Sequence, residues 1–256
     1  MTEKRIRMLV EYDGSGFEGY QLQGPDVRSV QSELEVAFSR LAGTRIRVHG
    51  AGRTDKGVHA TGQVVHADVC WRFTAEQAEV ALNANLPRDL VVRNVVEVDQ
   101  TFHAQRSATS RTYVYLIDNG RFRRPVIGNR AWHVERLLDI DAMRCAAERL
   151  TGVHDFASFG NAAKGKSTVR RMDVIDVRKR GDLVVVHITA NAFLRHMVRA
   201  LVGSYPLNAR VMGASPIGAN LENPPSSSSS KVSSFSSSEE REVVGGYWMG
   251  GAARDN

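Results

Sequence analysis

The sequence predicts an α+β fold: two similar lobes around a largely antiparallel or mixed sheet, with helices flanking it. Several segments alternate apolar and polar residues with the two-residue period of a half-buried strand. Others carry apolar residues at helical spacing behind a capping residue. Each half of the chain has the order strand, helix, further strands, although no repeat of fixed period is visible.

In the first half, alternation is clearest in residues 5–12, where Ile6, Met8, Val10 and Tyr12 share one face. The predicted strands of this half cover residues 5–12, 45–49, 63–70 and 90–98. The first helix is expected over residues 29–41, capped by Ser29 and ended by Gly43. The second opens at Thr74, whose spacing to Gln77 fits a capping box.

The second half continues the same pattern. Strands are predicted over residues 112–117 and 183–190, and a helix over 141–150. Residues 191–199 are expected to lead into a second helix, whose apolar residues are Phe193, Met197, Val198 and Leu201. The pair His154-Asp155 invites comparison with a catalytic dyad, but a helix-ending turn with packed phenylalanines is the preferred interpretation. The basic residues of 164–180 are expected between strands, where they can follow phosphates or simply face solvent.

Residues 50–60 are the most informative stretch, because they combine three glycines, one carboxylate, two fixed cations and a histidine. Asp55 lies two residues after Arg53 and next to Lys56, and nearby cations favour the ionised carboxylate. An ionised carboxylate on a glycine-framed loop can act as a nucleophile or a base. A tight turn in which Asp55 accepts backbone hydrogen bonds explains the same composition. The stretch has neither the ending of a Walker loop nor the glycine spacing of a dinucleotide fingerprint.

Charge and cysteine usage restrict the class of partner and the compartment. The formal net charge of +6 and the isoelectric point of about 9.6 favour a polyanionic partner, nucleic acid first. Arginines cluster with Tyr113 and Tyr115 in residues 102–124, a combination suited to RNA, although two tyrosines on a strand are also ordinary packing residues. Cys70 and Cys145 form no CxxC pair, which fits a reducing compartment. With no signal core and no membrane-spanning run, a cytoplasmic protein is expected.

Four short sequence segments resemble motifs of one protein family. Residues 50–60 closely resemble the signature of the bacterial tRNA pseudouridine synthase A family, and residues 12–21, 152–159 and the Met-Val-Arg string ending at Arg199 are similar to other motifs of that family. The resemblance runs from about Ile6 to Gly203. It implies the pseudouridine synthase fold, with a basic central cleft between the lobes.

The resemblance also implies roles for single residues. Asp55 matches the catalytic aspartate, Tyr113 the tyrosine that packs on the target base, and Arg199 the partner of the aspartate. Arg53 and Arg199 are both expected to hold Asp55 ionised. The implied reaction isomerises uridine to pseudouridine in the anticodon stem and loop of tRNA, in a homodimer, with no metal and no cofactor. Whether Asp55 attacks the base or abstracts a sugar proton is left open.

Two other functions stay open at this point. One is a non-catalytic relative that binds tRNA and is disabled by an altered C-terminus. The other is a phosphate-ester enzyme that uses the glycine loop and Asp55, although the sequence shows no second carboxylate cluster to hold magnesium.

The domain boundaries follow from where the resemblance stops. The expected division is an N-terminal lobe, residues 1–104, with the catalytic loop, a C-terminal lobe, 105–203, and a tail, 204–256. Ser204-Tyr205-Pro206 is expected to interrupt a helix, and ten of the thirteen residues 226–238 are serine, which predicts poor order. Residues 246–249 look like a poor substitute for the family's last strand. A frameshifted gene end and a natural divergent tail both explain this change.

Overall fold

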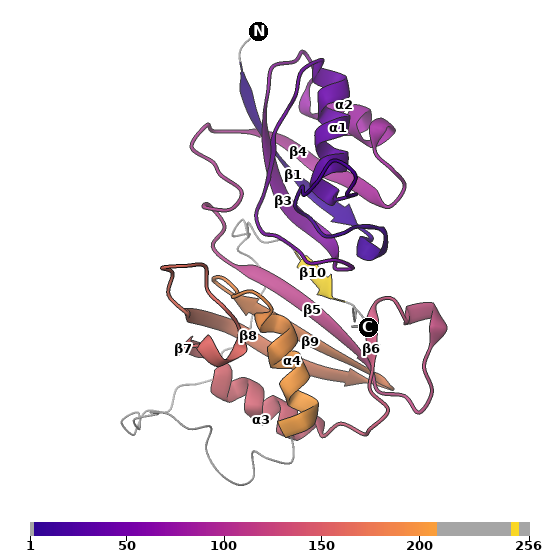
Figure 1. Ribbon diagram of the computed structural model, residues 1–256, viewed down its shortest axis with the longest axis vertical. Coiled ribbons are helices and arrows are strands. Elements are labelled where there is room, and N and C mark those ends of the chain that lie inside the picture. The colour runs from indigo at the N-terminus through magenta and orange to yellow at the C-terminus, as the bar shows by residue number, and fades with distance from the viewer. Residues whose placement is uncertain (1–2, 209–246, 251–256) are drawn as a thin grey trace, which may run out of the picture.

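A computed structural model describes residues 3–208 and 247–250. A mixed sheet with strand order β4-β1-β3-β10-β5-β9-β8-β7 crosses both halves of the molecule (Figure 1). Two short strands lie off this path: β2, Val48–Gly50, pairs with β3, and β6, Ala131–His133, pairs with β5. The predicted α+β class is therefore confirmed. Within the described residues, every helix is too short or too polar to span a membrane.

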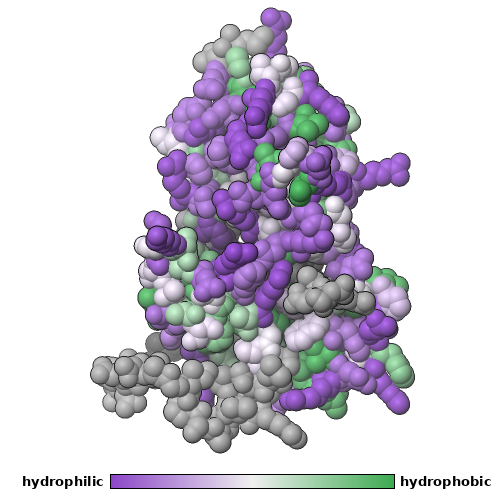
Figure 2. All heavy atoms as spheres, viewed as in Figure 1, coloured by the Kyte–Doolittle hydropathy of each residue, from purple (hydrophilic) through white to green (hydrophobic). Residues whose placement is uncertain are grey.

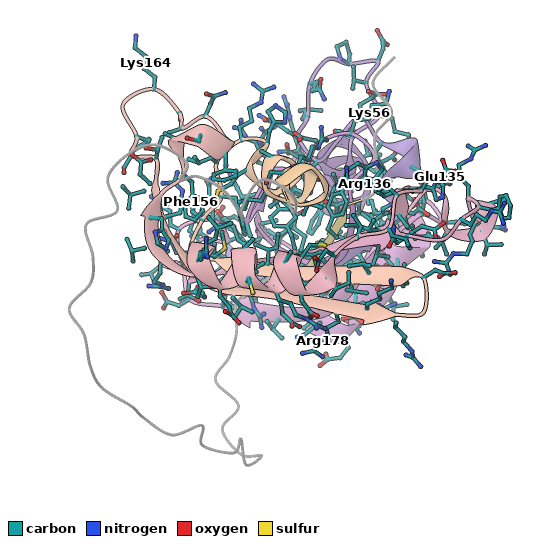
Figure 3. All side chains as sticks on the ribbon, turned by 90° about the horizontal axis from the view of Figure 1, so that it is seen from below. Lys56, Glu135, Arg136, Phe156, Lys164 and Arg178 are labelled. Atoms are coloured by element: carbon teal, nitrogen blue, oxygen red, sulfur yellow. The ribbon has the colours of Figure 1, made fainter. Side chains whose placement is uncertain are left out.

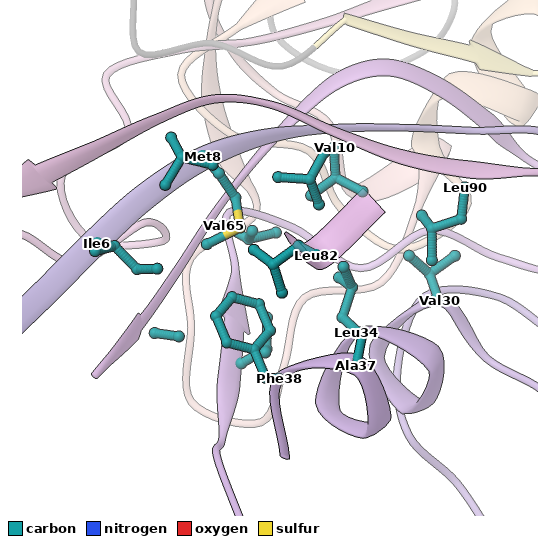
Figure 4. Packing of buried hydrophobic residues seen from close by; sticks show 14 of the residues in the cluster. Ile6, Met8, Val10, Val30, Leu34, Ala37, Phe38, Val65, Leu82 and Leu90 are labelled. Carbon is teal, nitrogen blue, oxygen red and sulfur yellow. The ribbon is translucent and has the colours of Figure 1, made fainter. Parts of the chain in front are cut away.

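The first half is three antiparallel strands with two helices on one face. Strand β1, Lys4–Tyr12, lies between β3, His59–Val69, and β4, Leu90–Val98. Helices α1, Val30–Ala42, and α2, Ala75–Asn85, cover the sheet (Figure 1). Met8, Val10, Leu34, Phe38 and Leu82 interlock between the layers (Figure 4). Burial of this apolar face is the main contribution to the stability of the layer.

Local signals set the ends of these helices, as predicted. The hydroxyl of Ser29 accepts a hydrogen bond from the backbone nitrogen of Ser32 at 3.1 Å. Thr74 and Gln77 form a full capping box. Gly43 ends α1 in the left-handed conformation, with φ of 68°, which glycine adopts without steric cost.

The second half repeats the layered arrangement. Its strands are β5, Arg111–Asp118, β9, Leu183–Ala190, β8, Val169–Arg180, and β7, Gly152–Asp155. Helices α3, Ile140–Leu150, and α4, Met197–Asn208, pack beside it. Its core includes Ile117, Met143, Phe156, Ile188 and Met197, and Phe156 lies inside this half in Figure 3. Three short 3-10 turns, Gly14–Gly16, Pro125–Ile127 and Ala157–Phe159, complete the described elements.

The basic stretch and the His154 region differ from expectation. Residues 169–180 of the basic stretch form the long strand β8 rather than a link between strands. Cross-strand pairing with β7 and β9 explains this, because backbone hydrogen bonds override the polar composition. His154 and Asp155 lie in the short strand β7 rather than in a turn, while Phe156 is fully buried as a packed phenylalanine.

Strand β10, Tyr247–Gly250, corrects the expectation for the end of the chain. It lies between the halves, antiparallel to β3 and parallel to β5, with Trp248 opposite Ala60 and Tyr113 (yellow in Figure 1). The expectation that this segment is a poor last strand is wrong. Where the two halves meet, strands β3 and β5 present backbone N–H and C=O groups that can pair with a further strand. Such backbone pairing does not require particular side chains.

Helix α4 gives a second correction. It continues through residues 204–206 to Asn208, although Pro206 was expected to stop it. Pro206 lies in the last turn, where it removes only one backbone hydrogen bond. The serine-rich stretch 226–238, with its expected poor order, lies outside the described residues.

A histidine cluster on β2, β3 and the loop after β4 predicts a pH-dependent stability. Burial, followed by the charges of His49 and His103, lowers the pKa of His66 to about 4. Its Nδ1 accepts a hydrogen bond from the backbone nitrogen of Ala104 at 3.2 Å. Between pH 7 and 5 the unfolded chain binds a proton at this residue and the folded chain does not. Stability therefore falls as the pH is lowered, by about 2 kcal/mol from this group.

Substituting His66→Gln should reduce this loss, because glutamine can accept the same hydrogen bond but does not titrate. Urea unfolding of both proteins at pH 7 and pH 5 measures the difference. An identical pH dependence in the two proteins would show that His66 does not contribute as described.

Candidate active site

A pocket of about 1060 Å³ lies where the two halves meet. Its walls come from residues 51–58, from β5, from residues 161–170 and from the segment that leads into α4. Asp55, Arg53, Tyr113 and Arg199 all line it, so the structure brings the four predicted site residues to one place.

Buried hydrogen bonds hold the loop that carries Asp55. The Tyr12 hydroxyl contacts Thr54 Oγ1 at 2.8 Å and donates to Gln63 Oε1 at 2.9 Å. Gln63 Nε2 in turn donates to the carbonyl of Gly52 at 2.7 Å. Burial keeps the pKa of Tyr12 well above its ordinary value, so its hydroxyl keeps its proton. Thr54 is thereby fixed inside the protein, and the next residue, Asp55, faces the pocket.

Two glycines of the loop are needed for its path. A Cβ atom at Gly50 would lie 2.5 Å from Tyr20 Cζ, so only glycine fits beside that ring. Gly57 has φ of +75°, in the left-handed region that favours glycine. Gly50 is thus required by the close approach of a side chain, and Gly57 by its backbone conformation.

The carboxylate of Asp55 lies close to two side chains from the start of α4, a histidine and an arginine. Its Oδ2 lies 3.2 Å from Arg199 Nη2 and 3.6 Å from His196 Nδ1. The side chains of Asp55 and Arg199 are 47% and 42% exposed, so solvent screens the pair and its contribution to stability is small. The predicted proximity of Arg199 and Asp55 is confirmed.

Arg53 does not fulfil the expectation that it pairs with Asp55. Its side chain is exposed and lines the pocket, and the described residues show no ion pair between the two side chains. Lys56 pairs instead with Glu18 at 2.6 Å. Neighbours in a tight loop point in different directions, so closeness in sequence does not produce a contact here.

Tyr113 reaches the pocket from β5. Its ring meets that of Phe193 edge to face, with 4.9 Å between centroids. Burial, and then the charge of Asp55, raise the pKa of Tyr113 to about 12. Its hydroxyl is therefore protonated at neutral pH, and its ring forms an apolar wall close to the carboxylate.

Sequence reasoning did not single out Arg111 or His196 as site residues. Arg111 donates to the carbonyls of Asn191 and Ala51, at 2.9 and 3.1 Å, and so ties β5 to the loop that carries Asp55. Burial lowers its pKa, but the guanidinium stays charged near neutral pH. In the sequence, the only sign of Arg111 was its place in the arginine-rich region. The only sign of His196 was its place shortly before Arg199.

A contact between the halves supports the far end of the loop. His59 Nδ1 accepts from the backbone nitrogen of Gly14, and Nε2 lies 3.2 Å from the carbonyl of Asn129. Asp13 Oδ1 also lies 3.1 Å from Nδ1. Beside it, Arg130 pairs with Asp13 at 2.6 Å. The loop is thus anchored to both halves of the molecule.

Positive charge predominates in the pocket lining. Its carboxylates are Glu18 and Asp55, and its lysines and arginines are Arg53, Lys56, Arg111, Lys166, Arg170, Arg195 and Arg199. Hydrophilic residues also cover most of the face seen in Figure 2. Among the described residues, no group of three or more His, Cys, Asp or Glu side chains is arranged to hold a metal ion.

Comparison with known proteins gives a consistent result. A family model described as tRNA pseudouridine synthase matches residues 8–105 and 146–215. A tRNA pseudouridine synthase A of Psychromonas ingrahamii is 43% identical over 208 residues, covering 78% of this chain and 77% of the relative. Proteins of the same name from Afipia carboxidovorans and Shewanella sp. strain ANA-3 are each 45% identical, cover 78% of this chain, and are covered over 82% and 77% of their own lengths. The chain therefore belongs to the tRNA pseudouridine synthase family.

Proposed function

We propose that this protein isomerises uridine to pseudouridine in the anticodon stem and loop of tRNA, with Asp55 as the catalytic residue. The observation that carries the proposal is the position of Asp55. It lies on the glycine-framed loop within the matched family region, faces the pocket, and has Arg199 at 3.2 Å.

The reaction rearranges bonds without a net change in composition. The bond from uracil N1 to ribose C1′ breaks, a bond from C5 to C1′ forms, C5 loses a proton and N1 gains one. The sugar–base junction must meet a nucleophile or base, and the Asp55 carboxylate supplies it. Arg199 keeps a positive charge beside that carboxylate and orients it. Attack on the base and removal of a sugar proton use the same carboxylate.

Tyr113 and Arg53 complete the substrate site. Uracil leaves the RNA stack to reach the pocket, which costs a few kcal/mol and is offset by contacts inside. The Tyr113 ring, supported by Phe193, packs on the base and retains it after the bond to ribose breaks. Arg53, exposed at the pocket, pairs with a backbone phosphate.

The cations around the pocket suit the phosphates of the same RNA. Lys56 and Lys164 lie on one side of the molecule, opposite Arg178 (Figure 3). Each phosphate neutralised by such a cation releases counterions, so tRNA affinity should fall steeply with salt. In this proposal residues 1–104 and 105–203 are the two lobes, the protein is a cytoplasmic homodimer, and one tRNA touches both subunits.

Tritium release tests the proposal. A tRNA transcript with uridine tritiated at C5 is incubated with the purified protein in EDTA, and tritium in water is counted. Release that matches pseudouridine found by nucleoside mass spectrometry supports the isomerase. Salt-sensitive tRNA binding without release would indicate the non-catalytic relative. Magnesium-dependent cleavage of a phosphate ester would indicate the phosphate-ester enzyme.

Arg199→Met should lower the single-turnover rate by about 10²-fold, because a positioned charge beside the reacting group is lost. The Kd for tRNA should change less than the rate. Arg195→Met is the matched control, since Arg195 also lines the pocket but forms no ion pair with Asp55 within the described residues. Equal rate losses in the two variants would argue against a specific effect of Arg199 on Asp55.

A further inference from the structure

His196 has an unusual backbone at the edge of the pocket. Its φ is 64°, in the left-handed region that costs a residue other than glycine about 1–2 kcal/mol. Its carbonyl accepts a hydrogen bond from the backbone nitrogen of Ala200, so the first turn of α4 fixes the position of the strained residue. Strain of this kind persists where the surrounding structure imposes it, and it concentrates in functional sites.

The strained backbone places the imidazole next to Asp55. Nδ1 lies 3.6 Å from Asp55 Oδ2, the oxygen that Arg199 also approaches. That distance is too long for a hydrogen bond, so the imidazole is a neighbour of the carboxylate and not its fixed partner. The side chain is 46% exposed and lines the pocket. Within residues 3–208 and 247–250, no hydrogen bond engages its Nε2.

The proposed isomerisation leaves one proton without a carrier. When C5 joins C1′, its hydrogen must leave, and N1 must gain a proton for the product to be neutral. The carrier has to accept a proton and release it near neutral pH. Arg199 stays protonated, and the raised pKa of Tyr113 keeps its phenol protonated. Asp55 is already committed to the sugar–base junction.

We propose, on the basis of the isomerase function above, that His196 is a further catalytic residue that carries this proton. Neutral imidazole accepts the proton from C5 as the C5–H electron pair restores the ring. The imidazolium, next to the negative charge of Asp55, then returns a proton to N1 directly or through water. Histidine is the side chain whose ordinary pKa suits both steps.

An isotope experiment separates proton transfer from a merely structural role. His196→Asn keeps a polar side chain that tolerates the left-handed backbone, but it cannot carry the proton. Its single-turnover rate should fall by about 10²-fold or more, with KM for tRNA nearly unchanged. With uridine deuterated at C5, this variant should turn over more slowly than with protium, because proton removal has become rate-limiting. The wild type should show a smaller isotope effect.

Chemical rescue gives a second readout. His196→Gly accepts the backbone conformation and leaves space at the pocket edge, so added imidazole should restore part of its rate. Imidazole should not restore Asp55→Asn. His154→Asn is the control, since His154 lies on β7, outside the pocket lining, where its ring contacts the carbonyl of Thr151.

Three outcomes decide the inference. A slow His196→Asn with a raised isotope effect, and a His196→Gly rescued by imidazole, support it. A normal rate in His196→Asn, or a slow rate with an unchanged isotope effect and no rescue, overturns it while the isomerase stands. A folded wild type that forms no pseudouridine overturns the proposed function, and this inference with it.

Discussion

Replacing Asp55 with asparagine should lower pseudouridine formation by at least about 10⁴-fold. Asparagine has nearly the same shape but no negative charge, so it provides neither nucleophile nor base, and the contact with Arg199 at 3.2 Å is no longer an ion pair. Because this pair is partly exposed, the free energy of unfolding should change by less than about 0.5 kcal/mol. Single-turnover rates and the Kd for tRNA measure the two effects separately.

Asp176→Asn is the matched control for this substitution. Asp176 pairs with Arg178 at 2.6 Å on β8 and does not line the pocket. Its removal should leave the rate unchanged. Near-normal turnover by Asp55→Asn would show that the carboxylate is not the catalytic group.

Gly14→Ala should destabilise the fold by about 3 kcal/mol and also impair turnover. A Cβ atom at this position would lie 2.0 Å from the carbonyl oxygen of Val58, a backbone atom that cannot rotate away. This steric clash pushes the loop from Asp55 to Val58 outward. It also disturbs the hydrogen bond that the backbone nitrogen of Gly14 donates to His59 Nδ1. Urea unfolding and single-turnover rates at a temperature where the variant remains folded measure the two losses.

Gly24→Ala provides the control, because a Cβ atom there would make an ordinary contact of 3.8 Å with Val27 Cγ2. It should match the wild type in stability and rate. If Gly14→Ala also matched the wild type, the close packing between the turn at Gly14 and the catalytic loop would be refuted.

The elements that sequence predicted best depend on near neighbours. Strands β4 and β9 agree with prediction at both ends, because alternation and flanking turns define them. The same holds for the caps at Ser29 and Thr74, where the deciding hydrogen bonds span three residues. Local chemistry was sufficient at these positions.

The features that sequence did not predict depend on contacts between distant segments. Strand β10 exists through backbone pairing with β3 and β5, for which its residues carry no strong signal. At the site, Arg53 is close to Asp55 in sequence but not paired with it, whereas His196 arrives from the start of α4. The resemblance pointed to Arg199, and the strained backbone of His196 becomes visible only in the fold.

Mapping of pseudouridine in a single tRNA after a single turnover tests the central claim most directly. An unmodified transcript is incubated with excess wild-type protein, and each uridine is then examined by chemical derivatisation and primer extension. The account predicts pseudouridine in the anticodon stem and loop, no change in the mass of the RNA, and none of this product with Asp55→Asn. A folded wild type that binds the tRNA but leaves every uridine unchanged, or an equally active Asp55→Asn, would contradict it.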